Sequence, residues 1–216
     1  VGAGWPCKEE RNRRLVEAIE MMRALWRGEE VTRDGLIRSD EARLWSLPGE
    51  PPLLFAAALT PETAELAGGW ADGLITINQP REKLGEFVAA FRGNGGAGKP
   101  LYLQVHLSFA AGEEEARRYA HEQWRTNALS GAVAAELHKP ALFDAATQFV
   151  RPEDLDASVR ISADLERHVA WLAADVDQGF DAVLLHNVGR NQREFIEVFG
   201  EKVLPRVLSA AQTEAA

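Results

Sequence analysis

The stretch PPLLFAAALTPETAELAGGWADGLITI, residues 51–77, decides the fold class. It contains two apolar runs, residues 53–57 and residues 74–77, which predict two buried strands. Between them, Thr60 and Pro61 predict the start of a helix, because threonine caps a helix N-terminus and proline suits the first helical position. Two buried strands joined by a helix form a βαβ unit, so the strands are expected to be parallel.

The turn between the first strand and the helix is the first candidate binding site. Ligands bind parallel sheets at the carboxyl ends of the strands, where a helix N-terminus offers N–H groups without partners. Ala57, Ala58, Leu59 and Thr60 occupy that place. We expect these four residues to bind a ligand. An ordinary capped turn is the alternative, since every βα connection needs one.

The same alternation continues along the chain. Two further strands are expected at 101–109 and 180–187. Helices are expected at 9–27 with Gly28 as the stop, from Pro61 onward, over the apolar positions from Leu84 to Phe91, at 113–129, at 132–147 with a break at Pro140, at 164–178 with Gly179 as the stop, and at 192–208 with a bend at Pro205. Residues 29–50 and 152–162 read as short extended or irregular pieces. Such alternation is typical of the α/β class, either an open doubly wound sheet or part of a (β/α)8 barrel. A complete barrel usually needs about 250 residues, and the four predicted strands are half of one.

Composition excludes several classes of function. The chain has 216 residues, 46% of them hydrophobic, which is enough for a core in a single domain over residues 1–216. A net charge of −9 without a basic cluster makes nucleic acid and anionic membranes poor partners. The single cysteine, Cys7, favours a reducing cytoplasm. Apolar runs are too short for a bilayer span, and the histidines lack ligand spacing, so we expect no membrane segment and no metal.

Three stretches resemble the luciferase-like flavin and deazaflavin oxidoreductases. They are RNRRLVEAIEMMRALWRGEEVTRDG (11–35), the opening stretch (51–77) and GFDAVLLHNVGRNQREFIEVFGEKVLPRVL (179–208). The resemblance is greatest to the subgroup that includes the coenzyme F420-dependent glucose-6-phosphate dehydrogenases. It implies a (β/α)8 TIM barrel of the bacterial luciferase-like type that lacks its N-terminal strands in this chain. Those strands carry the catalytic residues of relatives, so no catalytic residue is assigned here.

The resemblance also implies FMN or coenzyme F420 as the cofactor. In relatives, the turn equivalent to Ala57, Ala58, Leu59 and Thr60 contributes backbone contacts to the flavin or deazaflavin. Deazaflavin members often have Gly-Gly there, which allows close approach of the backbone. Ala58 and Leu59 replace these glycines, which weakens the case for F420 and leaves FMN open.

Three polar residues are candidates for contact with a small-molecule substrate. Strand alternation sets Gln104 and His106 on one face, and the resemblance places His106 toward the barrel mouth. His186 matches a histidine of relatives and ends a strand, on the functional side of barrels. A buried structural histidine is the alternative for His106. Trp124 lies in a segment that covers the substrate pocket in relatives, although helix packing explains it equally well.

Two functional hypotheses follow. The first is an oxidoreductase that transfers hydride between the cofactor and a small organic substrate, or an FMN-dependent monooxygenase. The second is a truncated, inactive barrel fragment with a structural or dimerising role. A homodimer is expected in either case. We do not expect glucose 6-phosphate as the substrate, because Gln79 or Pro80 and Ser158 replace the phosphate-binding Lys and Arg of the resembled subgroup.

Overall fold

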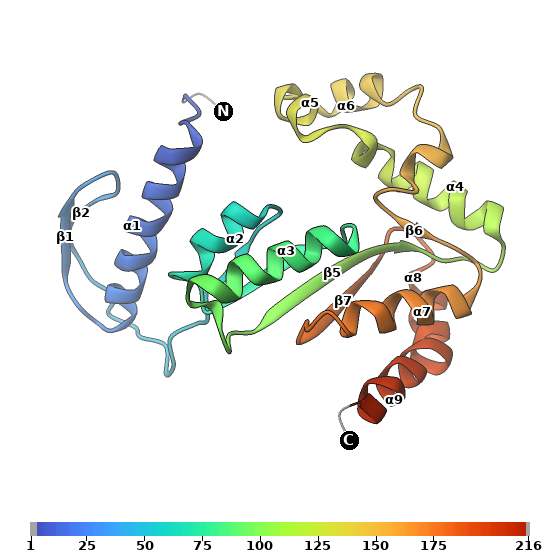
Figure 1. Ribbon diagram of the computed structural model, residues 1–216. Helices are drawn as coiled ribbons and strands as arrows, with labels where there is room; N and C mark the ends of the chain where they lie inside the picture. The colour runs from blue at the N-terminus through green and yellow to red at the C-terminus, as the bar shows by residue number, and fades with distance from the viewer. Residues whose placement is uncertain (1–3, 215–216) are drawn as a thin grey trace.

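The N-terminal part of the chain is a long helix followed by a hairpin. In a computed structural model, which describes residues 4–214, helix α1 (Lys8–Trp26) ends before Gly28, whose φ of 79° only glycine adopts readily. Strands β1 (Val31–Asp34) and β2 (Arg38–Ala42) then pair antiparallel. Both elements lie to one side of the main sheet (Figure 1).

The main sheet contains five strands, and every pairing in it is parallel. Its strands are β3 (Phe55–Ala57), β4 (Gly73–Ile77), β5 (Leu101–Ser108), β6 (Arg160–Ile161) and β7 (Ala182–Asn187). β3 pairs with β4 and β4 with the first half of β5, while β7 pairs with β5 along nearly its whole length. β6 pairs with the last two residues of β5. The parallel βαβ unit predicted from the sequence is confirmed.

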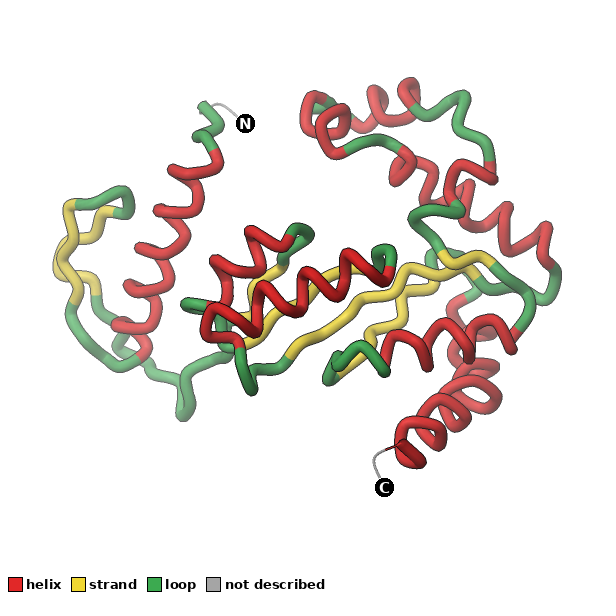
Figure 2. Tube along the Cα trace, viewed as in Figure 1, coloured by secondary structure: helices red, strands yellow, loops and turns green. Residues whose placement is uncertain are grey.

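Helices follow the strands and cover one face of the sheet (Figure 2). Those associated with the sheet are α2 (Pro61–Gly68), α3 (Arg81–Phe91), α7 (Leu165–Val176), α8 (Gln192–Val198) and α9 (Leu204–Glu214). Beyond the carboxyl end of β5 lie α4 (Glu113–Trp124), α5 (Gly131–Glu136) and α6 (Pro140–Ala146). Short irregular turns complete the chain: η1 (Arg92–Gly96), η2 (Arg125–Ala128), η3 (Pro152–Leu155) and η4 (Phe199–Val203).

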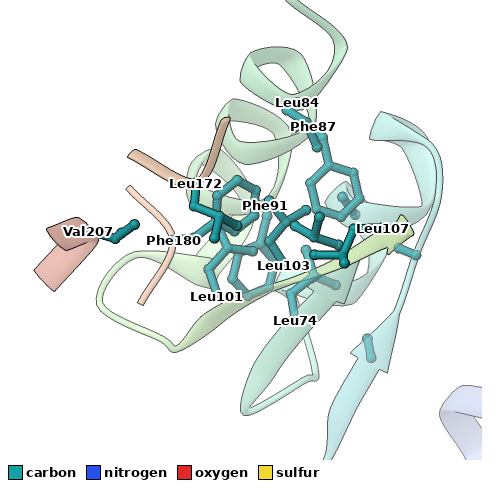
Figure 3. Close-up of a cluster of buried hydrophobic side chains, with 14 of the residues drawn as sticks. Leu74, Leu84, Phe87, Phe91, Leu101, Leu103, Leu107, Leu172, Phe180 and Val207 are labelled. Atoms are coloured by element: carbon teal, nitrogen blue, oxygen red, sulfur yellow. The ribbon is translucent and has the colours of Figure 1, made fainter. Parts of the chain in front are cut away.

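The hydrophobic core lies between the sheet and these helices. Leu101, Leu103 and Val105 alternate along β5 toward the covered face and are fully buried. They pack with buried side chains of the helices, including Phe87, Phe91 and Leu172 (Figure 3). Burial of one such side chain contributes about 1.5–3 kcal/mol, so this face holds the fold together.

Among the described residues, no helix runs along the opposite face of the sheet, and α4 reaches only its carboxyl end, through Trp124 (Figure 1). By register, Gln104 of β5 lies beside Leu184 of β7, and His106 lies beside His186. Leu184 is 44% exposed, whereas the side chains of the core on the covered face are buried. Polar and exposed side chains therefore gather on this open face.

Three details of the structure bear on the sequence-based expectation for the second half of the chain. The irregular link predicted at 152–162 contains the two-residue strand β6, which adds a fifth strand to the expected four. The last helix is interrupted by the wide turn η4 just before Pro205, because proline has no N–H to continue the helical pattern. Pro140 breaks the preceding helical region as expected, at the first position of α6.

Candidate functional site

Two histidines face each other on the open side of the sheet. His106 and His186 are register partners near the carboxyl ends of β5 and β7. Their ring centroids are 5.3 Å apart with an interplanar angle of 81°. Equivalent positions on adjacent parallel strands point to the same side, so the pairing follows directly from the register. The predicted substrate residues His106 and His186 thus come together.

Trp124 closes this pair into a cluster of three rings. It is the last residue of α4, and its ring centroid lies 4.9 Å from that of His186 and 5.3 Å from that of His106, edge to face in both cases. The indole Nε1 of Trp124 and the Nδ1 of His186 are buried without a hydrogen-bond partner among the described residues. Buried polar atoms without a partner are costly, and a bound molecule would satisfy them only after a side chain of the cluster moves to expose them.

Gln104 supports the neutral form of His106. Its side-chain Nε2 lies 3.2 Å from Nε2 of His106. Since an amide nitrogen can only donate, the imidazole nitrogen accepts, and the ring hydrogen sits on Nδ1. Burial, and after it the charge of His186, holds the pKa of His106 below its ordinary value of 6.5. His106 is therefore neutral at physiological pH.

Asn78 belongs to the site, although no motif in the sequence selects it. Its Oδ1 accepts a hydrogen bond from the backbone N–H of His106 at 2.8 Å. Its own N–H donates to Gln104 O at 3.0 Å. The only signal in the sequence is its place directly after β4, at the carboxyl end of a buried strand.

The predicted cofactor turn, residues 57–60, stands at the end of β3, which is separated from β5 by β4. It lies at the carboxyl ends of the strands, as the histidine cluster does. Thr60 caps α2 as expected, because its Oγ1 accepts from Thr63 N at 3.4 Å. Ala58 is buried and its N–H donates to Ile75 O, whereas Ala57 and Leu59 are exposed. The N–H groups of Leu59 and Thr60 donate to no atom of residues 4–214.

Charge at this turn restricts what can bind there. The Thr60 hydroxyl and the N–H of Glu62 hold the pKa of the Glu62 carboxyl below its ordinary value. That carboxylate already faces the start of α2, so a phosphate is disfavoured at the helix N-terminus. Neutral ring atoms suit the two N–H groups better. Gln79 closes the turn from the other side, donating from Nε2 to Leu59 O at 3.3 Å.

Two of the cations near the site, Arg160 and Arg125, are held by carboxylates. Arg160 pairs with Asp175, its Nη2 lying 2.8 Å from Oδ1, and Asp175 is only 2% exposed. Arg125 donates to Asp144 at 2.8 Å. Arg81 and Lys139 are exposed at the surface. Arg160 could replace a phosphate-binding residue of the resembled subgroup, but it is held in a structural ion pair with Asp175.

Asn187 and Asn191 make no side-chain capping hydrogen bond to α8. Asn191 stands at the N-cap of α8 but makes no capping hydrogen bond. Instead, Asn191 Nδ2 donates to Phe109 O at 2.9 Å, and Asn187 Oδ1 accepts from Phe109 N at 3.2 Å. Phe109 lies just beyond the end of β5, so its backbone N–H and C=O have no strand partner and pair with these two side chains instead. The two amides thereby join the end of β5 to the end of β7 and the loop after it.

Two observations bear on metals and membranes. Within residues 4–214, no three His, Cys, Asp or Glu side chains gather as ligands for a metal ion. In the same part of the chain, no helix combines the length and the apolar character needed to cross a membrane.

Comparison with known proteins is consistent with this geometry. The F420-dependent glucose-6-phosphate dehydrogenase of Nakamurella multipartita is 29% identical over 216 residues, which covers 96% of this chain and 63% of that protein. An F420-dependent secondary alcohol dehydrogenase, solved in complex with an F420-acetone adduct, has a TM-score of 0.80 at 22% identity, covering 96% of this chain and 65% of that one.

A riboflavin lyase solved with modified FMN and riboflavin has a TM-score of 0.68 at 16% identity, covering 97% of this chain and 60% of that one. The chain thus spans less than two thirds of the length of these proteins. Their similarity confirms the predicted fold class, a parallel α/β structure of the luciferase-like TIM-barrel type. The luciferase-like monooxygenase family matches residues 2–182, and the chain belongs to this family.

Proposed function

We propose that this protein is an oxidoreductase that uses FMN or coenzyme F420 to transfer hydride to or from a small organic substrate. The observation that carries the proposal is the cluster of His106, His186 and Trp124 on the open face of the sheet. It stands at the carboxyl ends of the strands, the edge at which barrels of this type bind ligands. Family membership supports the same conclusion.

The turn of residues 57–60 fits a flat, uncharged ring system. Leu59 and Thr60 offer two N–H groups, and the exposed Ala57 leaves room on the open face. When bound, the cofactor accepts or donates the hydride, which is chemistry that protein side chains cannot supply. The residues of this turn hold and orient it. Because Ala58 and Leu59 replace a glycine pair, FMN stays open beside F420, and with it a monooxygenase reaction.

The histidine cluster is the proposed substrate side of the site. Once the three rings move apart to admit a substrate, the unpartnered Nδ1 of His186 and Nε1 of Trp124 can bind a hydroxyl or carbonyl oxygen. Neutral His106 can take a proton at Nε2 once Gln104 turns away, since that atom carries no hydrogen. The chain therefore positions the substrate and accepts its proton.

Titration of the purified chain with FMN and with F420, followed by histidine NMR, tests the proposal. Uptake of one cofactor should add its visible absorbance to the protein. The ring signals of His106 and His186 should then shift, while those of His168 on the covered side of the sheet stay unchanged. Uptake of neither cofactor would instead favour the second hypothesis, an inactive fragment with a structural or dimerising role.

Glucose 6-phosphate is not the proposed substrate. The Arg160 guanidinium is held by Asp175, and Gln79 and Ser158 are uncharged, so the phosphate lacks cations at these places. Addition of this sugar phosphate to the cofactor-loaded protein should give no reduction of the cofactor. Measurable reduction would refute this proposal.

Three further expectations stay predictions. They are a single domain over residues 1–216, a homodimer and a cytoplasmic location. Analytical ultracentrifugation at several protein concentrations measures the oligomeric state directly, and limited proteolysis tests whether the chain behaves as one domain.

A further inference from the structure

One edge of strand β5 has a gap at the level of His106. On that edge, β4 pairs with residues Leu101 to Gln104, and β6 pairs with Leu107 and Ser108. The N–H of His106 points into the interval between these two partners, because alternate residues of a strand direct their backbone groups to the same edge. No strand residue stands there to accept it.

The side chain of Asn78 fills this gap. Its backbone N–H continues the ladder by one step, to Gln104 O at 3.0 Å. Its Oδ1 then accepts from His106 N at 2.8 Å, as a strand carbonyl would. Its Nδ2 donates to Ser158 O at 3.5 Å, in the loop that leads into β6. One carboxamide thus connects three segments that meet at the proposed site.

The position of the His106 ring depends on this connection. His106 is 7% exposed, and its ring is placed within 5.3 Å of two other rings. A loss of the hydrogen bond to its N–H leaves a buried donor without a partner and frees the strand to shift. Small displacements at a reacting group reduce rates strongly, because proximity and orientation supply much of the rate enhancement.

We infer that Asn78 is a positioning residue: its carboxamide completes the broken edge of β5 and fixes His106 against His186 and Trp124. This inference rests on the proposed function for its consequence in catalysis. The anchoring itself is a property of the chain without cofactor. Asn78 touches no reacting atom and acts through His106.

Amide hydrogen exchange of His106, measured by NMR together with the titration of its ring, tests the inference. Asn78→Leu removes both polar groups at similar volume, and the His106 amide should exchange on the order of tenfold faster or more. Asn78→Asp keeps the acceptor, so exchange should stay near the wild-type rate, while the new carboxylate raises the pKa of His106. Where Asn78→Leu does not fold, Asn78→Ala replaces it.

Asn94→Leu is the matched control. Asn94 also donates from Nδ2 to a backbone carbonyl, that of Glu65 at 2.7 Å, but far from the site. It should leave the exchange and the titration of His106 unchanged. The inference would be overturned if the His106 amide in Asn78→Leu exchanged at the wild-type rate. It would also be overturned if this amide exchanged as fast in Asn78→Asp as in Asn78→Leu, or if Asn94→Leu speeded its exchange as much as Asn78→Leu does.

Cofactor uptake by the same samples separates the two proposals. If the wild-type chain takes up neither FMN nor F420 while Asn78→Leu speeds exchange, the proposed function fails and the anchoring stands. If the cofactor binds and the His106 amide exchanges at the same rate in wild type and Asn78→Leu, the proposed function stands and the inferred role of Asn78 is wrong.

Discussion

The two faces of β5 differ although they belong to one strand. Leu103 and Val105 point to the covered face and are fully buried among leucines and phenylalanines. Gln104 and His106 point to the open face, where Gln104 lies 3.2 Å from the ring of His106 and that ring faces Trp124. Strand alternation therefore separates the residues that stabilise the fold from those that can do chemistry. Substitutions on the two faces should act on different properties.

The largest loss of stability is expected from an unpaired charge next to the covered face. Asp175 of α7 is 2% exposed and holds Arg160 of β6. Asp175→Ala leaves a half-buried guanidinium without its partner, which should cost about 3–5 kcal/mol of unfolding free energy. Chemical denaturation measures this loss. The control is the double variant Arg160→Met/Asp175→Leu, which should recover most of the loss; equal stability of the single and double variants would contradict the account.

Neighbouring residues of β5 provide the next comparison. Leu103→Ala should cost about 2–5 kcal/mol, because it creates a cavity in the core. Gln104→Ala should cost only about 0.5–1.5 kcal/mol, yet it should raise the pKa of His106, since the donor to the neutral ring is lost. Denaturation and histidine NMR on both variants check this. Similar stability losses in the two variants would remove the distinction between the faces.

The smallest effect concerns pH. Burial lowers the pKa of His168 below 6.5, more than its hydrogen bond to Ser162 O raises it, and His106 is also lowered by burial. Well above pH 6.5 both rings are neutral whether the chain is folded or unfolded. As the pH falls below 6.5, the unfolded chain binds protons first, so stability decreases.

Thermal unfolding between about pH 7 and about pH 5 should show this decrease. His168→Gln and His106→Gln should each make the decrease smaller than in the wild type. A decrease of wild-type size in both variants would assign the acid sensitivity to the carboxylates instead.

Local signals in the sequence predicted most of the fold. Thr60 and Pro61 marked the start of α2, and Gly28 and Gly179 marked the ends of α1 and α7, where both glycines adopt positive φ. β6 escaped prediction because two residues are too few to show a strand period. Strand alternation likewise predicted that Gln104 and His106 share a face, and the register confirmed it.

The site depends more on contacts that are distant in sequence. Trp124 ends α4 and contacts His186 of β7, and all of the chain from η2 to α7 lies between them in sequence, so no spacing rule connects the two residues. Asn78 belongs to no local sequence pattern beyond its place after a strand. Its role depends on the gap along β5 between the last residue paired with β4, Gln104, and the first residue paired with β6, Leu107. Such contacts are set by tertiary packing, which sequence periodicity does not encode.

The central claim is that the open face of the sheet binds the cofactor at the turn of residues 57–60. Equilibrium binding of FMN and F420 to wild type, Ala57→Trp and Ala141→Trp tests it most directly, because both alanines are exposed and only Ala57 lies at this turn. Wild type and Ala141→Trp should bind the same cofactor equally, while Ala57→Trp should bind it at least about tenfold more weakly, a loss of about 1.4 kcal/mol. Equal affinity of all three proteins would contradict the claim.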